Sequence, residues 1–122
     1  MSNIFDMGLG LRYSSLNEVY STTSCCWKVL QDWPAAVKAE LADLLGLLAA
    51  GQSIGMPASR PMPDVAPGVS ELRIKDRSGQ FRVFYFTKNS DAILVFHAFL
   101  KKTQATPRHE LILAKGRLGD LL

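Results

Sequence analysis

The sequence predicts an α+β fold in which N-terminal helices pack on a small antiparallel sheet that is followed by a C-terminal helix. Apolar residues recur at helical spacing over residues 34–50, and three β-type segments separated by short turns begin near residue 70. A helix-start signal, Thr106-Pro107, then follows. This order predicts two layers, with the helices on one face of the sheet.

Length and composition are those of one globular domain rather than of a disordered or membrane protein. The chain has 122 residues, of which 48% are apolar and 20% are charged. The longest apolar stretch, Leu41–Ala50, contains Asp43 and Gly46 and is shorter than the roughly 20 residues that span a bilayer. No lysine or arginine precedes Arg12 and no signal-peptide core is evident, so we expect a cytoplasmic protein.

The N-terminal part has the weakest pattern. Residues 1–26 are interpreted as an extension or a first strand, and residues 27–122 as one domain. Threonine, serine, cysteine and aromatic residues favour a short strand over Tyr20–Trp27, with a helical turn at Lys28–Asp32. The adjacent cysteines at 25 and 26 fit inert packing residues better than a disulfide or a zinc site.

A helix is predicted over residues 34–50. Pro34 suits the first helical turn because its missing N–H is not needed there, and Gly51 supplies a C-terminal stop. The apolar stripe consists of Trp33, Val37, Leu41, Leu44, Leu45 and Leu48. Four of the six prolines fall in Gln52–Gly68, so we expect a connecting loop without regular structure.

Three strands are predicted after this loop: Ser70–Lys75, Gln80–Thr87 and Ala92–Leu100. The turns at residues 76–79 and 88–91 are short, which requires an antiparallel meander. The third strand is apolar on both faces, so we place it at the centre of the sheet. The last helix presents a stripe of Leu111, Ala114 and Leu118.

Charge is unevenly distributed along the chain. Residues 1–68 carry four basic and six acidic side chains, whereas residues 69–122 carry ten basic and five acidic ones, within a net charge of +3. A cationic half indicates a polyanionic partner, most often nucleic acid, although a solvated basic face is an equally plain interpretation.

Four short motifs in the second half together resemble a known family. They are E-L-R-I at residues 71–74, G-x-F-R-V at 79–83, H-A-F-x-K-K-T at 97–103 and T-P-R at 106–108. From residue 34 to 118 the sequence resembles the phage-derived HigB-like branch of the RelE/ParE toxin superfamily. The resemblance implies a toxin of a type II toxin–antitoxin system that cleaves mRNA on the ribosome without a metal. It also implies a cognate antitoxin that carries a helix-turn-helix DNA-binding domain, through which any contact with DNA is indirect.

The candidate catalytic residues are Arg82 and Lys102, which lie in the motifs of the resemblance, and His97, which is suggested by its acid–base chemistry. The arginine of the F-R-V segment is a phosphate contact in this family, and its planar fork can hold two phosphate oxygens; the alternative is a strand-face arginine whose head reaches solvent. The lysine pair ends a strand, where functional groups are common. His97 has a pKa suited to acid–base work, yet its alternation with Ile93, Val95 and neighbouring apolar residues fits a buried histidine equally well.

Further candidates for RNA binding are Arg73, Lys75, Lys101 and Arg108. The first two share a strand face with Glu71, and the alternative for them is a solvated hairpin surface. Arg108 would lie in the first turn of the last helix, where free N–H groups can assist phosphate binding.

Two weaker candidates accompany them. His109 follows directly in that same helical turn, and Tyr85 could stack on a base or transfer a proton, although an aromatic core residue is the commoner role in a strand.

Other function classes remain open at this stage. No P-loop, dinucleotide fingerprint or zinc-ligand spacing is present, so no cofactor is indicated. The main alternative is a ParE-like toxin that inhibits DNA gyrase without cutting RNA, and a second is an inactive toxin that survives as an antitoxin-bound regulator.

Overall fold

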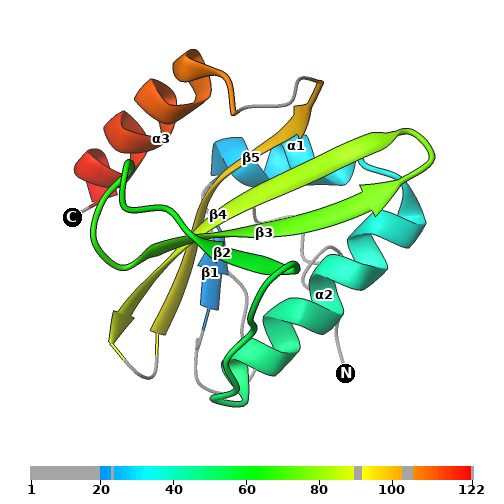
Figure 1. The fold of residues 1–122 in the computed structure, drawn as a ribbon, viewed down its shortest axis with the longest axis horizontal. Coiled ribbons are helices and arrows are strands. Elements are labelled where there is room, and N and C mark those ends of the chain that lie inside the picture. Colours follow the sequence, from blue (N-terminus) through cyan, green and yellow to red (C-terminus); the bar gives the residue numbers. More distant parts are fainter. Residues whose placement is uncertain (1–19, 23, 90–91, 103–105, 122) are drawn as a thin grey trace.

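An α+β arrangement is described for residues 20–22, 24–89, 92–102 and 106–121 by a computed structural model (Figure 1). In chain order the elements are β1 (Tyr20–Thr22), α1 (Ser24–Gln31), α2 (Ala35–Ala49), β2 (Ser59–Pro61), β3 (Val69–Asp76), β4 (Gly79–Asn89), β5 (Ala92–Lys101) and α3 (Arg108–Leu121). The strands form one sheet in the order β1-β5-β4-β3-β2. β1 pairs with β5 in parallel and the other neighbours are antiparallel, which confirms the predicted fold class and the β3–β4–β5 meander.

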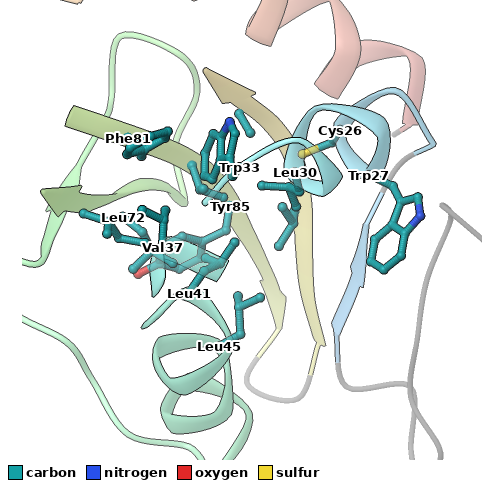
Figure 2. Packing of buried hydrophobic residues seen from close by; sticks show 14 of the residues in the cluster. Cys26, Trp27, Leu30, Trp33, Val37, Leu41, Leu45, Leu72, Phe81 and Tyr85 are labelled. Carbon is teal, nitrogen blue, oxygen red and sulfur yellow. The ribbon is translucent and has the colours of Figure 1, made fainter. Parts of the chain in front are cut away.

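The helices α1 and α2 form one side of the main core. Along α2 the buried residues Val37, Leu41 and Leu45 recur at helical spacing, as predicted. These residues face strand side chains, and Trp33 packs edge-on against Phe81 with ring centroids 4.8 Å apart (Figure 2). This cluster covers the sheet face made by the odd-numbered residues of β4, from Phe81 to Tyr85.

The predicted strand over Tyr20–Trp27 is only partly correct. Residues 20–22 form β1, but α1 begins at Ser24 and takes in the segment that was expected to be extended. The reason is burial: Cys26 and Leu30 are fully buried, and their spacing of four residues places both on the core side of a helix. The proposed N-terminal extension, residues 1–19, lies outside the described residues.

The helix α3 packs on the opposite face of the sheet, which corrects the prediction that all helices share one face. Ala114 and Leu118 join a second buried cluster with Phe84, Phe96 and Phe99. Phe84 alternates with the α2-facing residues of β4, so its side chain lies on the other face. In Figure 1, α3 and α2 accordingly lie on either side of the strands. The protein therefore has three layers, and only part of the α3 face is covered.

The proline-rich segment Gln52–Gly68 is not wholly irregular, contrary to expectation. Ser59–Pro61 forms the edge strand β2 and pairs with Ser70–Leu72 of β3. An edge position tolerates proline because one side of the strand needs no hydrogen bonds within the sheet. Proline composition therefore predicted the loop but missed a short strand within it.

The strand β5 departs from simple alternation. Tyr85 of β4 pairs with Val95, whereas Phe84 pairs with His97, so one extra residue forms a β-bulge at Phe96. The bulge turns His97 toward the α3 face, while Val95 remains on the α2 face. β5 lies between β1 and β4, and β4 rather than β5 is the middle strand.

The β3–β4 turn holds two basic strands at a fixed register. Asp76 and Gly79 pair across it, and the Asp76 carboxylate accepts hydrogen bonds from the Ser78 amide and hydroxyl at 3.1 and 2.6 Å. These bonds lower the pKa of Asp76. Gly79 has φ +147°, as the predicted turn requires. The second predicted turn, residues 88–91, lies partly outside the described residues.

None of the helices in the described ranges has the length and hydropathy to cross a membrane.

Candidate nucleic-acid interface

Cationic side chains from four adjacent strands meet on the part of the α3 face that the helix leaves uncovered. Two cross-strand rows build the surface, because paired residues point to the same side of a sheet. In the outer row Lys75 pairs with Gln80, and Gln80 with Lys101. In the next row Arg73 pairs with Arg82. We call Arg73, Lys75, Arg82 and Lys101, together with Arg60 of β2, the basic cluster.

An open depression of about 910 Å³ lies over the outer row. Its lining is predominantly cationic and polar, with residues from both strands and the turn of the β3–β4 hairpin and from the end of β5. The lining residues are Arg73, Lys75, Ser78, Gly79, Gln80, Leu100, Lys101 and Lys102. Four residues predicted from the sequence as RNA or catalytic contacts, the three lysines and Arg73, are thus brought together in one place. Such a surface is suited to a phosphate backbone.

Arg82 lies beneath this surface rather than on it. Its side chain is only 1% exposed, which rules out the alternative of a strand-face arginine whose head reaches solvent. Nη2 donates a hydrogen bond to Gln80 Oε1 at 2.8 Å, and Nη1 donates one to the Phe81 carbonyl at 3.4 Å. Gln80 is exposed and lines the depression, so the acceptor of the Arg82 hydrogen bond is itself part of this surface. Arg82 also borders a smaller depression of about 350 Å³, which Glu40, Pro57 and Ala58 line on its other side. In this conformation Arg82 supports the surface from below.

Glu71 is the anionic partner of the buried arginine. Its side chain is 2% exposed, and Oε1 lies 3.6 Å from Arg82 Nε and 3.8 Å from Arg73 Nε. Burial raises the pKa of Glu71, and Arg82 is the strongest of the neighbouring cations that oppose this rise. In the sequence, Glu71 stands out only as a neighbour of Arg73. The two-residue spacing from Arg73 and Lys75 predicts that Glu71 shares their face of the strand, but no sequence feature indicates that it is buried.

The remaining cations differ in exposure. Lys101 is partly buried, and desolvation followed by the charge of Arg82 lowers its pKa. Lys102 is exposed at the end of β5. Arg108 is exposed at the first residue of α3, and no ion pair among the described residues includes it. Arg60 joins the basic cluster through its pairing with Glu71, a contribution that no sequence motif signalled.

His97 occupies a separate, buried position between β5 and α3. It is 2% exposed, and its Nε2 lies 2.7 Å from Glu110 Oε1. Arg117 Nη1 donates to Nδ1 at 2.7 Å, so Nδ1 is the acceptor and Nε2 carries the proton that is donated to Glu110. Burial lowers the pKa of His97, which favours the neutral ring. This geometry favours the buried, hydrogen-bonded role that was weighed beside catalysis. His109 is exposed and lies 3.2 Å from Glu110.

Tyr85 lies on the other face of the sheet. It is 5% exposed, belongs to the core under α2 and shares a buried 2.9 Å hydrogen bond with the Ser59 hydroxyl. It therefore cannot stack on a base bound at the basic cluster. No group of three or more histidine, cysteine or acidic side chains in the described ranges is arranged to hold a metal ion.

Comparison with known protein families decides the family of this chain. Residues 28–119, well over half of the sequence, match the family described as phage derived protein Gp49-like (DUF891). The chain belongs to this family. Gp49-like proteins are RelE/HigB-type toxins, so the resemblance seen in the sequence is confirmed at that level. A search of curated proteins found no match.

Proposed function

We propose that this Gp49-like protein is the toxin of a type II toxin–antitoxin system and inhibits translation as a ribosome-dependent mRNA endonuclease. The observation that supports this best is the basic depression lined by Arg73, Lys75, Lys101 and Lys102. A polyanion with closely spaced phosphates matches its charge, and the family membership favours mRNA as that polyanion.

The proposed reaction is attack of a ribose 2′-OH on the adjacent phosphorus, with departure of the 5′ oxygen and formation of a cyclic phosphate. The 2′-OH proton has to be removed, the charge that develops on the phosphate has to be stabilised, and the leaving 5′ oxygen has to be protonated. We expect Arg73 and Lys102, which line the depression, to bind phosphate oxygens. Lys101 is the proposed proton donor, because its lowered pKa brings it closer to the pH at which a lysine can give up a proton.

The proposed dependence on the ribosome follows from the small number of proton acceptors at the basic depression. None of the described residues that line it has a carboxylate or an imidazole, and the exposed Glu40 lines a neighbouring depression, together with Arg73, Lys75 and Arg82. His97 is buried under α3. The ribosome would then order the mRNA and supply part of the proton-transfer environment, while the protein contributes positive charge.

A cognate antitoxin is the second proposed partner. Its role is to neutralise the toxin, and a helix-turn-helix domain on it would give the complex its only contact with DNA. Co-expression tests this part of the proposal: growth should stop when the protein is induced alone and continue when the product of the neighbouring reading frame is induced with it.

The nuclease is tested by induction with two double variants of equal charge change. Lys101→Ala/Lys102→Ala removes two cations from the depression, whereas Lys28→Ala/Lys115→Ala removes two exposed cations from other elements. Only the first variant should restore leucine incorporation and abolish cleavage of translated mRNA. Normal growth with soluble wild-type protein would refute toxicity, and efficient cleavage of naked RNA would refute ribosome dependence. Loss of DNA supercoiling with intact mRNA would instead favour a gyrase inhibitor.

A further inference from the structure

The ion pair between Glu71 and Arg82 is buried yet loosely made. The Nε–Oε1 distance is 3.6 Å, and that from Arg73 Nε to the same oxygen is 3.8 Å. Charge-assisted hydrogen bonds are typically about 2.7–2.9 Å long. Glu71 Oε2 and Arg82 Nε are both buried and make no hydrogen bond. One carboxylate thus attracts two arginines without being hydrogen-bonded to either.

This geometry differs from that of a carboxylate that fixes an arginine in place. A fixing carboxylate normally holds the planar fork through two short parallel bonds. Here the guanidinium is instead held by Gln80 and by the Phe81 carbonyl. Glu71 compensates the charge of the cluster without locking its shape. A buried donor and acceptor without partners are costly, which favours an arrangement in which they become bonded.

We propose that Glu71 is an internal counter-ion of the resting protein, and that a phosphate group of bound RNA replaces it as the partner of Arg82 and Arg73. This inference rests on the proposed function, because it assigns the phosphate to RNA held in the basic depression. Arg82 then passes from a supporting position to direct contact with the phosphate once the Gln80 amide moves aside. The sequence motif that joins Glu71 and Arg73 in one strand thereby supplies both the resting anion and one of the cations it releases.

If phosphate replaces Glu71 in this way, RNA binding should be accompanied by protonation of Glu71. The cations that face Glu71 come from four strands: Arg60 of β2, Arg73 of β3, Arg82 of β4 and Lys101 of β5. All four hold the pKa of the buried carboxyl down against desolvation. A phosphate that takes over these cations and adds negative charge nearby raises the pKa of Glu71 further. RNA binding should therefore take up a proton.

The experiment measures binding of a short 2′-O-methyl RNA, which cannot be cleaved, to the full chain at low salt. Glu71→Gln keeps the shape and removes the competing charge, so its affinity should rise by about tenfold or more. Asp43→Asn is the matched control, because it removes one negative charge from an exposed position on α2. Its affinity should change by less than about twofold, since exposed charges at a distance are screened. Calorimetry in two buffers of different ionisation enthalpy should show proton uptake by the wild type and none by Glu71→Gln.

The possible results separate the role of Glu71 from the RNA surface itself. Wild-type binding with unchanged or weaker affinity in folded Glu71→Gln would overturn the counter-ion and leave the proposed RNA surface standing. No binding by the wild type would overturn the counter-ion and the proposed RNA surface, whereas the toxin function is decided separately by the induction experiment. If Glu71→Gln fails to fold, the Arg82 Nε–H resonance of the wild-type protein decides, since it should shift as RNA is added. An unmoved Arg82 signal beside shifting signals of Arg73 would show that Glu71 only fixes Arg82 in place.

Discussion

Replacement of Arg82 by methionine tests how the buried pair couples stability to the site. Methionine fills much of the same space but leaves the Glu71 carboxylate buried without its closest cation. Breaking one side of a buried ion pair typically costs about 3–5 kcal/mol. We therefore expect Arg82→Met to lower stability as well as activity.

The loss in free energy of unfolding caused by Arg82→Met has an upper bound that depends on pH. A carboxyl that loses its cation can take up a proton instead, at a cost of about 1.36 kcal/mol per pH unit above its unfolded pKa. From the ordinary value of 4.5, this cost is at most about 3.4 kcal/mol at pH 7 and about 0.7 kcal/mol at pH 5. Wild-type Glu71 already has a raised pKa, so the difference between the two proteins is smaller than the bound. We expect about 2–3 kcal/mol at pH 7, equivalent to a fall in Tm of roughly 10 °C.

The sign of the pH dependence separates this mechanism from simple loss of packing. A carboxyl whose folded pKa is raised contributes stability below its unfolded pKa and loses it as pH rises through the folded pKa. Arg82→Met extends this loss to higher pH, so the deficit in free energy of unfolding relative to the wild type should be smaller at pH 5 than at pH 7. Urea unfolding of both proteins at both pH values measures this deficit. Glu71→Gln/Arg82→Met is the control, because without the charge most of the deficit should disappear. A deficit that is equal at both pH values, or that persists in the double variant, would refute the reasoning.

Three further predictions concern single positions. Lys102→Ala should weaken association with single-stranded RNA and reduce the slope of log affinity against log salt by about 0.7, which salt titration measures; an unchanged slope would exclude a phosphate contact. His97→Gln should remove a loss of stability as pH falls below 6.5, because burial lowers the pKa of His97; the same change in Tm between pH 7.5 and pH 5 in the variant and the wild type would contradict this. Tyr85→Phe should cost about 1 kcal/mol through its lost bond to Ser59 but leave toxicity intact, so loss of toxicity in the folded variant would place Tyr85 in the active surface.

The sequence predicted most elements because local pattern and tertiary packing agree in them. The helical spacing over α2, the β3–β4 turn and the apolar stripe of α3 all appear in the structure as expected. The prediction failed at α1, where a composition typical of strands was overridden by the burial of Cys26 and Leu30. It also failed on the layers, because the pattern of β5 is apolar on both faces and does not specify which helix covers which face.

The sequence named the residues that the candidate site groups, but not how deeply each is buried. Strand alternation put Arg73 and Lys75 on one face, and the structure brings Lys101 beside them. Whether an arginine lies on or beneath such a surface depends on its cross-strand neighbours, which requires the register of three strands. The bulge at Phe96 shows the same limit, since one extra residue moved His97 to the face opposite Val95.

The division of the sheet into two faces explains why charge can be buried here at all. The α2 face carries the larger apolar cluster and supplies much of the hydrophobic stabilisation. On the other face α3 covers Phe84 and Phe99, and Arg82, the cross-strand partner of Phe99, extends that face beyond the apolar cluster. The polar and charged neighbours of Arg82 are Gln80 and Glu71, and of these Gln80 is exposed. In the proposed exchange, this exposed side chain is the group that moves when Arg82 leaves its resting partner for a phosphate.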